Sequence, residues 1–133
     1  MKPLERILHA EDDVDIQFLL ELSFETRPEF VYHCCDNGEV LLSQVHDFQP
    51  DLIVLDMMMP RLNGLETLDK LKEDSRTRDI PVIFLTAKIQ PEEVSHYQKR
   101  GAFAILFKPI ELTSLPDQLK ALWQSYHKQQ GSL

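Results

Sequence analysis

The amino-acid sequence predicts an α/β fold: a doubly wound, five-stranded parallel sheet with five helices on its two faces. Five short apolar runs alternate with segments in which apolar residues recur at helical spacing. In the clearest run, Leu52–Leu55, four aliphatic residues stand between Pro50 and Asp56, without the polar alternation of a half-exposed strand. Strands that alternate with helices at these spacings are typical of βαβ units, which build parallel sheets covered on both faces.

The predicted strands are apolar runs bounded by turn residues or by charged residues. They are Arg6–Ala10, Phe30–Cys34, Leu52–Leu55, Val82–Leu85 and Phe103–Phe107.

The predicted helices follow from apolar spacing and from residues that favour helix ends. They lie at about 14–24, 40–45, 65–71, 92–100 and 114–126. The first is expected to bury Ile16, Leu19, Leu20 and Phe24, and Asp13 or Asp12 suits its amino-terminal cap. The helix at 92–100 has only Val94 and Tyr97 as an apolar stripe, so we expect it to be weakly anchored and able to move.

Composition favours one compact domain. The chain has 133 residues, with 43% hydrophobic and 27% charged residues and a net charge of -8. We expect a single domain over 1–133, with its core at about 5–127 and a short polar tail at 128–133. The negative charge argues against direct nucleic-acid binding, and no apolar run approaches the ~18 residues of a membrane span. The adjacent Cys34 and Cys35 fit reduced thiols and a cytoplasmic location.

Polar residues gather where the predicted strands end. Glu11 and Asp12 follow the first strand, Asp56 the third, Thr86 the fourth and Lys108 the fifth. The carboxyl ends of parallel strands share one edge, so three carboxylates, a hydroxyl and an ammonium should meet there. Neighbouring carboxylates repel one another and therefore either keep a proton or hold a cation, for which Mg²⁺ is the simplest candidate. One carboxylate could then attack phosphorus while Lys108 and Thr86 contact the phosphoryl oxygens.

Four segments carry these polar residues in order along the chain: Ile7–Asp13, Asp51–Pro60, Ile83–Ala87 and Phe107–Pro109. In this order they resemble the signatures of the response-regulator receiver domain of two-component signalling, close to the chemotaxis regulators. The resemblance spans about Ile7 to Tyr126 and implies a flavodoxin-like strand order of 2-1-3-4-5.

The resemblance also implies a role for each acidic residue. Asp56 would accept the phosphoryl group, Asp12 would bind Mg²⁺ directly, and Glu11 would bind it through water. Met58 would contribute its backbone carbonyl to the metal, which any side chain permits. Asp13 is expected to be an exposed helix cap.

The remaining signatures concern the switch. Thr86 would bond to a phosphoryl oxygen, and Lys108 would pair first with Asp56 and then with the phosphate. The bond before Pro109 is expected to be cis. Ile105 stands where such domains usually carry Tyr or Phe, so switching by an inward turn of that ring is in doubt, although Thr86 could still pull on the helix at 92–100.

The partners that the resemblance implies are a histidine kinase or phosphotransfer protein as donor and a downstream effector protein as receiver of the signal. The output surface would be the face built by the fourth helix, the fifth strand and the fifth helix, and phosphorylation could also drive dimerisation. Self-phosphorylation from small acyl phosphates and slow hydrolysis of the product are expected. No direct contact with nucleic acid or membrane is implied.

Two other functions stay open. A receiver-like interaction module could use the same fold without turning over phosphate. A Mg²⁺-dependent aspartyl phosphatase of the haloacid dehalogenase type would need a second acid two residues after its nucleophile, where this chain has Met58, and usually a cap domain. A nucleotide-binding role is weaker, because the sequence has neither G-x-G-x-x-G nor a P-loop. The run Met57–Met59 is expected to fill gaps around a loop.

Overall fold

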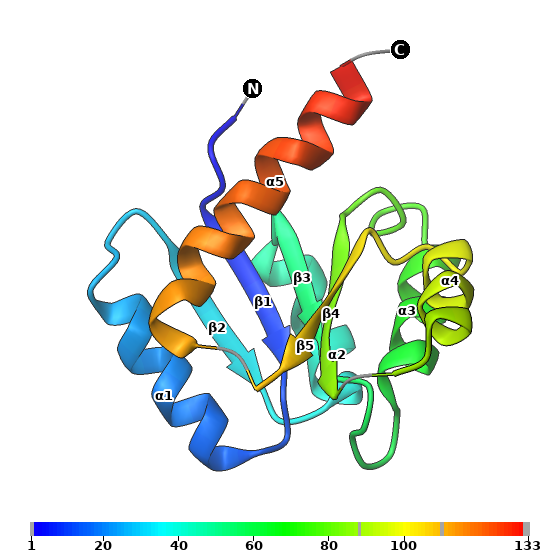
Figure 1. The fold of residues 1–133 in the computed structure, drawn as a ribbon, viewed down its shortest axis with the longest axis horizontal. Helices are drawn as coiled ribbons and strands as arrows, with labels where there is room; N and C mark the ends of the chain where they lie inside the picture. Colours follow the sequence, from blue (N-terminus) through cyan, green and yellow to red (C-terminus); the bar gives the residue numbers. More distant parts are fainter. Residues whose placement is uncertain (1, 88, 110, 132–133) are drawn as a thin grey trace.

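A computed structural model describes residues 2–87, 89–109 and 111–131. Its five strands form one parallel sheet in the order β2-β1-β3-β4-β5, which confirms both the predicted fold class and the strand order (Figure 1). The strands are β1 (Arg6–Ala10), β2 (Val31–Cys35), β3 (Leu52–Leu55), β4 (Val82–Ala87) and β5 (Ala104–Lys108).

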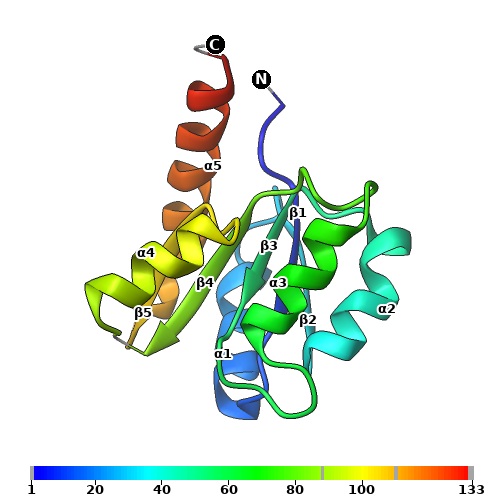
Figure 2. The same ribbon diagram turned by 90° about the vertical axis from the view of Figure 1, so that its right-hand side faces the viewer.

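Five helices connect and cover the strands. They are α1 (Val14–Glu25), α2 (Gly38–Phe48), α3 (Gly64–Glu73), α4 (Pro91–Lys99) and α5 (Leu115–Gly131), and a single 3₁₀ turn at Leu112–Ser114 precedes α5. Helices α1 and α5 lie on one face of the sheet, and α2, α3 and α4 lie on the other (Figure 2). Within the described ranges, none of the helices combines the length and the apolar character that a bilayer crossing requires.

Most observed boundaries lie a few residues from the predicted ones, and the differences in β2, β4, β5 and α5 are the clearest. Strand β2 begins and ends one residue later than expected, and β4 and β5 extend far enough to include Thr86 and Lys108. The extension follows from continued pairing, since Thr86 lies beside Phe107 in the β4–β5 ladder. Helix α5 continues to Gly131, beyond the predicted end of this helix at residue 126, because Lys and Gln are good helix formers.

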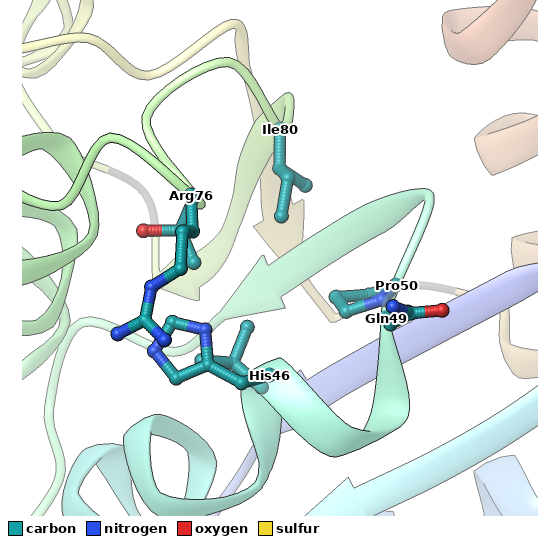
Figure 3. Close-up of a pocket in the computed structure, with 7 residues that line it drawn as sticks. His46, Gln49, Pro50, Arg76 and Ile80 are labelled. Atoms are coloured by element: carbon teal, nitrogen blue, oxygen red, sulfur yellow. The ribbon is translucent and has the colours of Figure 1, made fainter.

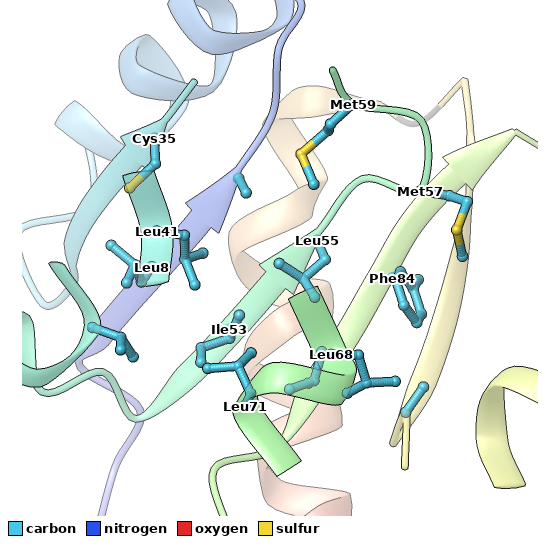
Figure 4. Close-up of a cluster of buried hydrophobic side chains, with 14 of the residues drawn as sticks. Leu8, Cys35, Leu41, Ile53, Leu55, Met57, Met59, Leu68, Leu71 and Phe84 are labelled. Carbon is cyan, nitrogen blue, oxygen red and sulfur yellow. The ribbon is translucent and has the colours of Figure 1, made fainter. Parts of the chain in front are cut away.

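Two apolar cores flank the sheet. The core under α2, α3 and α4 contains the side chains drawn in Figure 4, with Leu8, Ile53 and Leu55 from the central strands against Leu41 and Leu68 from the helices. The core under α1 and α5 packs residues of β1, β3 and β4 against Leu20, Phe24, Leu115, Leu119 and Trp123. The central strands are therefore buried on both faces, which accounts for their uninterrupted apolar sequences.

Side-chain caps place the amino termini of three helices at the carboxyl edge of the sheet. Asp13 accepts hydrogen bonds from two backbone N–H groups of α1, Asn37 accepts one from α2, and Asn63 forms a reciprocal capping box with Glu66 of α3. The cap role predicted for Asp13 is confirmed. Helix α4 begins at Pro91, and the side chain of the preceding Gln90 makes no capping hydrogen bond, so the start of α4 is held less firmly than those of α1, α2 and α3.

Candidate functional site

Three carboxylates meet at the carboxyl edge of the sheet. Each of Glu11, Asp12 and Asp56 offers one oxygen, and these oxygens lie within 4.8 Å of one another. Glu11 and Asp12 follow β1, and Asp56 follows the neighbouring β3, where its backbone N–H donates to the carbonyl of Ala10 at 3.1 Å. Glu11 and Asp56 are buried, whereas Asp12 is exposed. We call these three residues together with Lys108 the acid pocket.

Lys108 brings a positive charge into the acid pocket. Its Nζ donates to Glu11 Oε1 at 2.8 Å and to Asp56 Oδ2 at 3.3 Å. Burial alone lowers the pKa of this ammonium, but hydrogen bonding and attraction from Glu11 and then Asp56 outweigh burial and raise its pKa above the usual value. Lys108 is therefore charged and ties the end of β5 to the ends of β1 and β3.

Glu11 is the most perturbed carboxyl group of the acid pocket. Burial raises the pKa of its side chain to about 7; the hydrogen bond from Lys108 opposes this shift, and repulsion from Asp56 adds to it. The single positive charge of Lys108 thus compensates only part of the negative charge of the three neighbouring carboxylates. Hard carboxylate oxygens with one exposed side, open to water, are the donor set that Mg²⁺ prefers, so the residues present fit this ion.

Thr86 lies near the carboxyl end of β4, and Ile105 lies on β5, three residues before Lys108. Thr86 is buried. Leu55 of β3 pairs with Phe84 of β4, so Asp56 is level with Leu85, and Thr86 lies one residue beyond that level. Ile105 pairs with Phe84 and packs partly buried against the core under α2, α3 and α4. The position of Ile105 is thus filled by a stiff aliphatic side chain that packs against the core from a partly buried position.

The loop after Asp56 is closely packed. Met57 and Met59 are buried in the core, which confirms the gap-filling role predicted for two of the three methionines, while the Met58 side chain is 76% exposed. The Gly64 N–H donates to the Met57 carbonyl at 2.9 Å. A Cβ at Gly64 would lie 2.4 Å from the Asp56 carbonyl oxygen, so only glycine permits this approach. The peptide bond before Pro109 is cis, as predicted.

Sequence reasoning missed two residues near the acid pocket. His9 is fully buried two residues before Glu11, its Nδ1 lies 2.8 Å from the Tyr32 hydroxyl, and burial followed by repulsion from Lys108 lowers its pKa to about 3. Gln17 on α1 donates hydrogen bonds to the Glu11 carbonyl and to the Asp36 carboxylate. The alternation of side chains along β1 could have indicated that His9 shares a face with Glu11, but no sequence pattern indicates the contacts of Gln17.

A separate cavity of about 490 Å³ lies at the opposite edge of the sheet (Figure 3). Its lining comes from the end of α2, the residues before β3 and the residues before β4. Its lining residues are Val45, His46, Gln49, Pro50, Arg76, Thr77 and Ile80, none of which is a predicted site residue.

The strand order and the position of the acid pocket define a class: open α/β proteins that bind their ligands where the parallel strands end. Comparison with known protein families narrows the class of this chain to one family: the family described as "Response regulator receiver domain" matches residues 7–120. The chain belongs to this family, as its four sequence signatures predicted.

Curated relatives are longer than this chain. It is 35% identical over 121 residues to the DNA-binding dual master transcriptional regulator RpaA of Synechocystis, covering 90% of this chain and 49% of that protein. It is 31% identical to the regulatory protein AtoC of Escherichia coli, covering 86% of this chain and 24% of AtoC. The chain thus spans half or less of the length of these relatives.

Solved structures agree in fold. The receiver domain of the Francisella response regulator 1452 superposes with a TM-score of 0.80 at 27% identity, covering 92% of this chain and 98% of that one. The chemotaxis response regulator CheY4 of Vibrio cholerae gives a TM-score of 0.81 at 21% identity, covering 90% and 98%. The likeness to CheY4 is one of fold.

Proposed function

We propose that this protein is a phosphorylation-dependent signalling switch in which Asp56 accepts a phosphoryl group from a phosphohistidine of a kinase or phosphotransfer protein. A carboxylate oxygen of Asp56 forms the new bond to phosphorus while the bond from phosphorus to the histidine nitrogen breaks, and the imidazole leaves. The observation that carries this proposal is the position of Lys108, whose ammonium contacts both Asp56 and Glu11 in the acid pocket. A fixed cation beside the nucleophile stabilises the charge on the transferring phosphoryl oxygens.

Mg²⁺ is part of the proposal. Asp12, Asp56 and the Met58 carbonyl would bind the ion directly, and Glu11 would bind it through water. When bound, the ion neutralises charge on the acids and on the phosphoryl oxygens. The close approach of the three carboxylates supports this assignment, since burial and then repulsion from Asp56 raise the pKa of Glu11 when no cation is bound.

A protein donor suits the surface beside the acid pocket. Val14 and Phe18, on the first turns of α1, are 68% and 61% exposed, and Val14 lies two residues after Asp12. Exposed apolar side chains at this place favour contact with another protein over contact with water. Small acyl phosphates would still react, because the nucleophile, Lys108 and the metal ligands all belong to this chain.

The proposed output surface consists of α4, β5 and α5. Added phosphoryl charge would draw the Thr86 hydroxyl toward Asp56 and shift the loop that leads to α4, with Ile105 packing in place of an aromatic ring. Support comes from the start of α4, which lacks a side-chain cap, and from its single buried residue, Tyr97. Hydrogen exchange before and after phosphorylation tests this step: unchanged protection in α4 and the preceding loop would contradict it.

The decisive experiment is incubation with Mg²⁺ and acetyl phosphate followed by intact-mass measurement. We expect one phosphoryl adduct on the wild type and none on Asp56→Asn. An adduct that persists on Asp56→Asn would displace Asp56 from its role. No adduct on either protein would favour the interaction module without phosphoryl turnover.

Partners and location complete the proposal. The donor would be a histidine kinase or phosphotransfer protein, the recipient a downstream effector or a second copy of the chain, and the location the cytoplasm. DNA binding is named for RpaA, of which this chain covers half, and we do not extend it to this domain. The net charge of -8 also argues against a nucleic-acid surface.

A further inference from the structure

Gln17 connects two loops of the carboxyl edge. Its side-chain Nε2 donates to the backbone carbonyl of Glu11 and, at 3.1 Å, to Oδ1 of Asp36. Glu11 belongs to the segment between β1 and α1, and Asp36 to the turn between β2 and α2. One amide group on α1 therefore holds both segments, using both of its N–H bonds.

This contact follows from helix geometry. Side chains on a helix lean toward its amino terminus, so an amide in the second turn of α1 can reach a carbonyl that precedes the helix. The Glu11 N–H already donates to the Cys35 carbonyl at 3.0 Å, which joins the same two segments through the backbone. Gln17 adds the second connection, and together they fix the direction in which the chain leaves β1.

We propose that Gln17 is a positioning residue for the Mg²⁺ site: it orients the peptide between Glu11 and Asp12 and so holds both carboxylates near Asp56. This inference rests on the proposed function. Asp12 is exposed, so its position depends on the backbone more than on packing around its side chain. Without the Gln17 amide, the peptide can rotate and the carboxylates spread apart.

The test is the Mg²⁺ affinity of the unphosphorylated protein, measured by titration calorimetry and by the Mg²⁺-dependent rise in melting temperature. Gln17→Met keeps the length of the side chain and removes both hydrogen bonds. We expect its Mg²⁺ dissociation constant to rise about 3- to 10-fold, as for the loss of one or two hydrogen bonds. Gln17→Asn keeps the amide but shortens its reach, so we expect a similar rise in its Mg²⁺ dissociation constant. This variant replaces Gln17→Met in the test if Gln17→Met does not fold.

Gln44→Met is the matched control. Gln44 is also a helix glutamine with two side-chain partners, His33 at 2.9 Å and Cys35 at 3.4 Å, but it lies on α2 and contacts no member of the acid pocket in these bonds. Its loss should lower the melting temperature without Mg²⁺ to a similar extent and leave the Mg²⁺ dissociation constant unchanged. A merely structural role of Gln17 would give the same pattern.

A double-mutant cycle isolates the link to the second loop. In the Asp36→Ala background, Gln17→Met should weaken Mg²⁺ binding less than in the wild type, because the amide has already lost one partner. If the wild type binds Mg²⁺ and forms the phosphoryl adduct while Gln17→Met and Gln17→Asn bind Mg²⁺ equally well, only the role of Gln17 is refuted. If the wild type neither binds Mg²⁺ nor forms the adduct, the proposed function fails, and the role of Gln17 with it.

Discussion

Replacing Glu11 by Gln should change how stability depends on pH. Burial raises the pKa of Glu11 from 4.5 to about 7 in the folded protein. Between these two pH values the folded protein keeps the Glu11 proton that the unfolded chain releases. The stability that this proton contributes is therefore fully present below pH 4.5 and is lost as the pH rises through 7. With a folded-state pKa of about 7, the contribution of the Glu11 carboxyl to the free energy of unfolding falls by about 2 to 3 kcal/mol between pH 5 and pH 8.

The measurement is urea unfolding of the wild type and Glu11→Gln at pH 5, 6, 7 and 8 with a metal chelator. The free energy of unfolding of the wild type should fall relative to that of Glu11→Gln by about 2 to 3 kcal/mol across this range, or roughly 6–15 °C in melting temperature. His9, whose pKa is lowered to about 3, destabilises both proteins below pH 6.5 and cancels in the difference. Excess Mg²⁺ at pH 8 should stabilise the wild type more than Glu11→Gln, because only the wild type has the Glu11 carboxylate charge for the ion to neutralise. Parallel pH curves for the two proteins would refute the assignment of a strained, buried acid.

Two further substitutions test the packing and the donor surface. Gly64→Ala places a methyl group 2.4 Å from the Asp56 carbonyl oxygen and 2.7 Å from the Phe84 ring, so we expect a loss of about 1–3 kcal/mol in urea unfolding and weaker Mg²⁺ binding; unchanged values would contradict the close approach. Phe18→Ser should slow phosphoryl transfer from a protein donor while leaving the acetyl phosphate reaction unchanged, whereas Val31→Ser, on the exposed edge strand β2, should affect neither. An equal loss with both substrates would exclude a docking role for Phe18.

The strands and the acid pocket could be predicted because their sequence signals are local. A strand covered on both faces must be apolar throughout, so Asp56 after Leu52–Leu55 marks the end of a central strand. Parallel pairing then forces such ends to one edge, and Glu11, Asp56 and Lys108 meet there although up to 97 residues separate them. The assembly of the acid pocket thus follows from topology alone.

The buried face of α1 could not be fully predicted from its sequence. Apolar residues occur almost all around this helix, so the spacing of Ile16, Leu19, Leu20 and Phe24 did not single out one face. Leu20 and Phe24 are buried as expected, but Leu19 is 46% exposed. The contacts of Gln17 were also beyond sequence reasoning, because a long polar side chain reaches partners that depend on the path of a loop rather than on a repeating pattern.

Helix α5 joins the two ends of the molecule. It starts at Leu115, shortly after Lys108, is 17 residues or about 25 Å long, and ends beyond the far end of the sheet (Figure 1). It is fastened partway along, where Trp123 Nε1 donates to the Lys2 carbonyl at 2.9 Å and the Tyr126 hydroxyl donates to the Asp79 carbonyl at 3.1 Å. Because Leu115 and Leu119 are buried in the core as well, α5 is anchored from its first turn to Tyr126, and a displacement at its start can reach its far end only if the whole helix moves as one body.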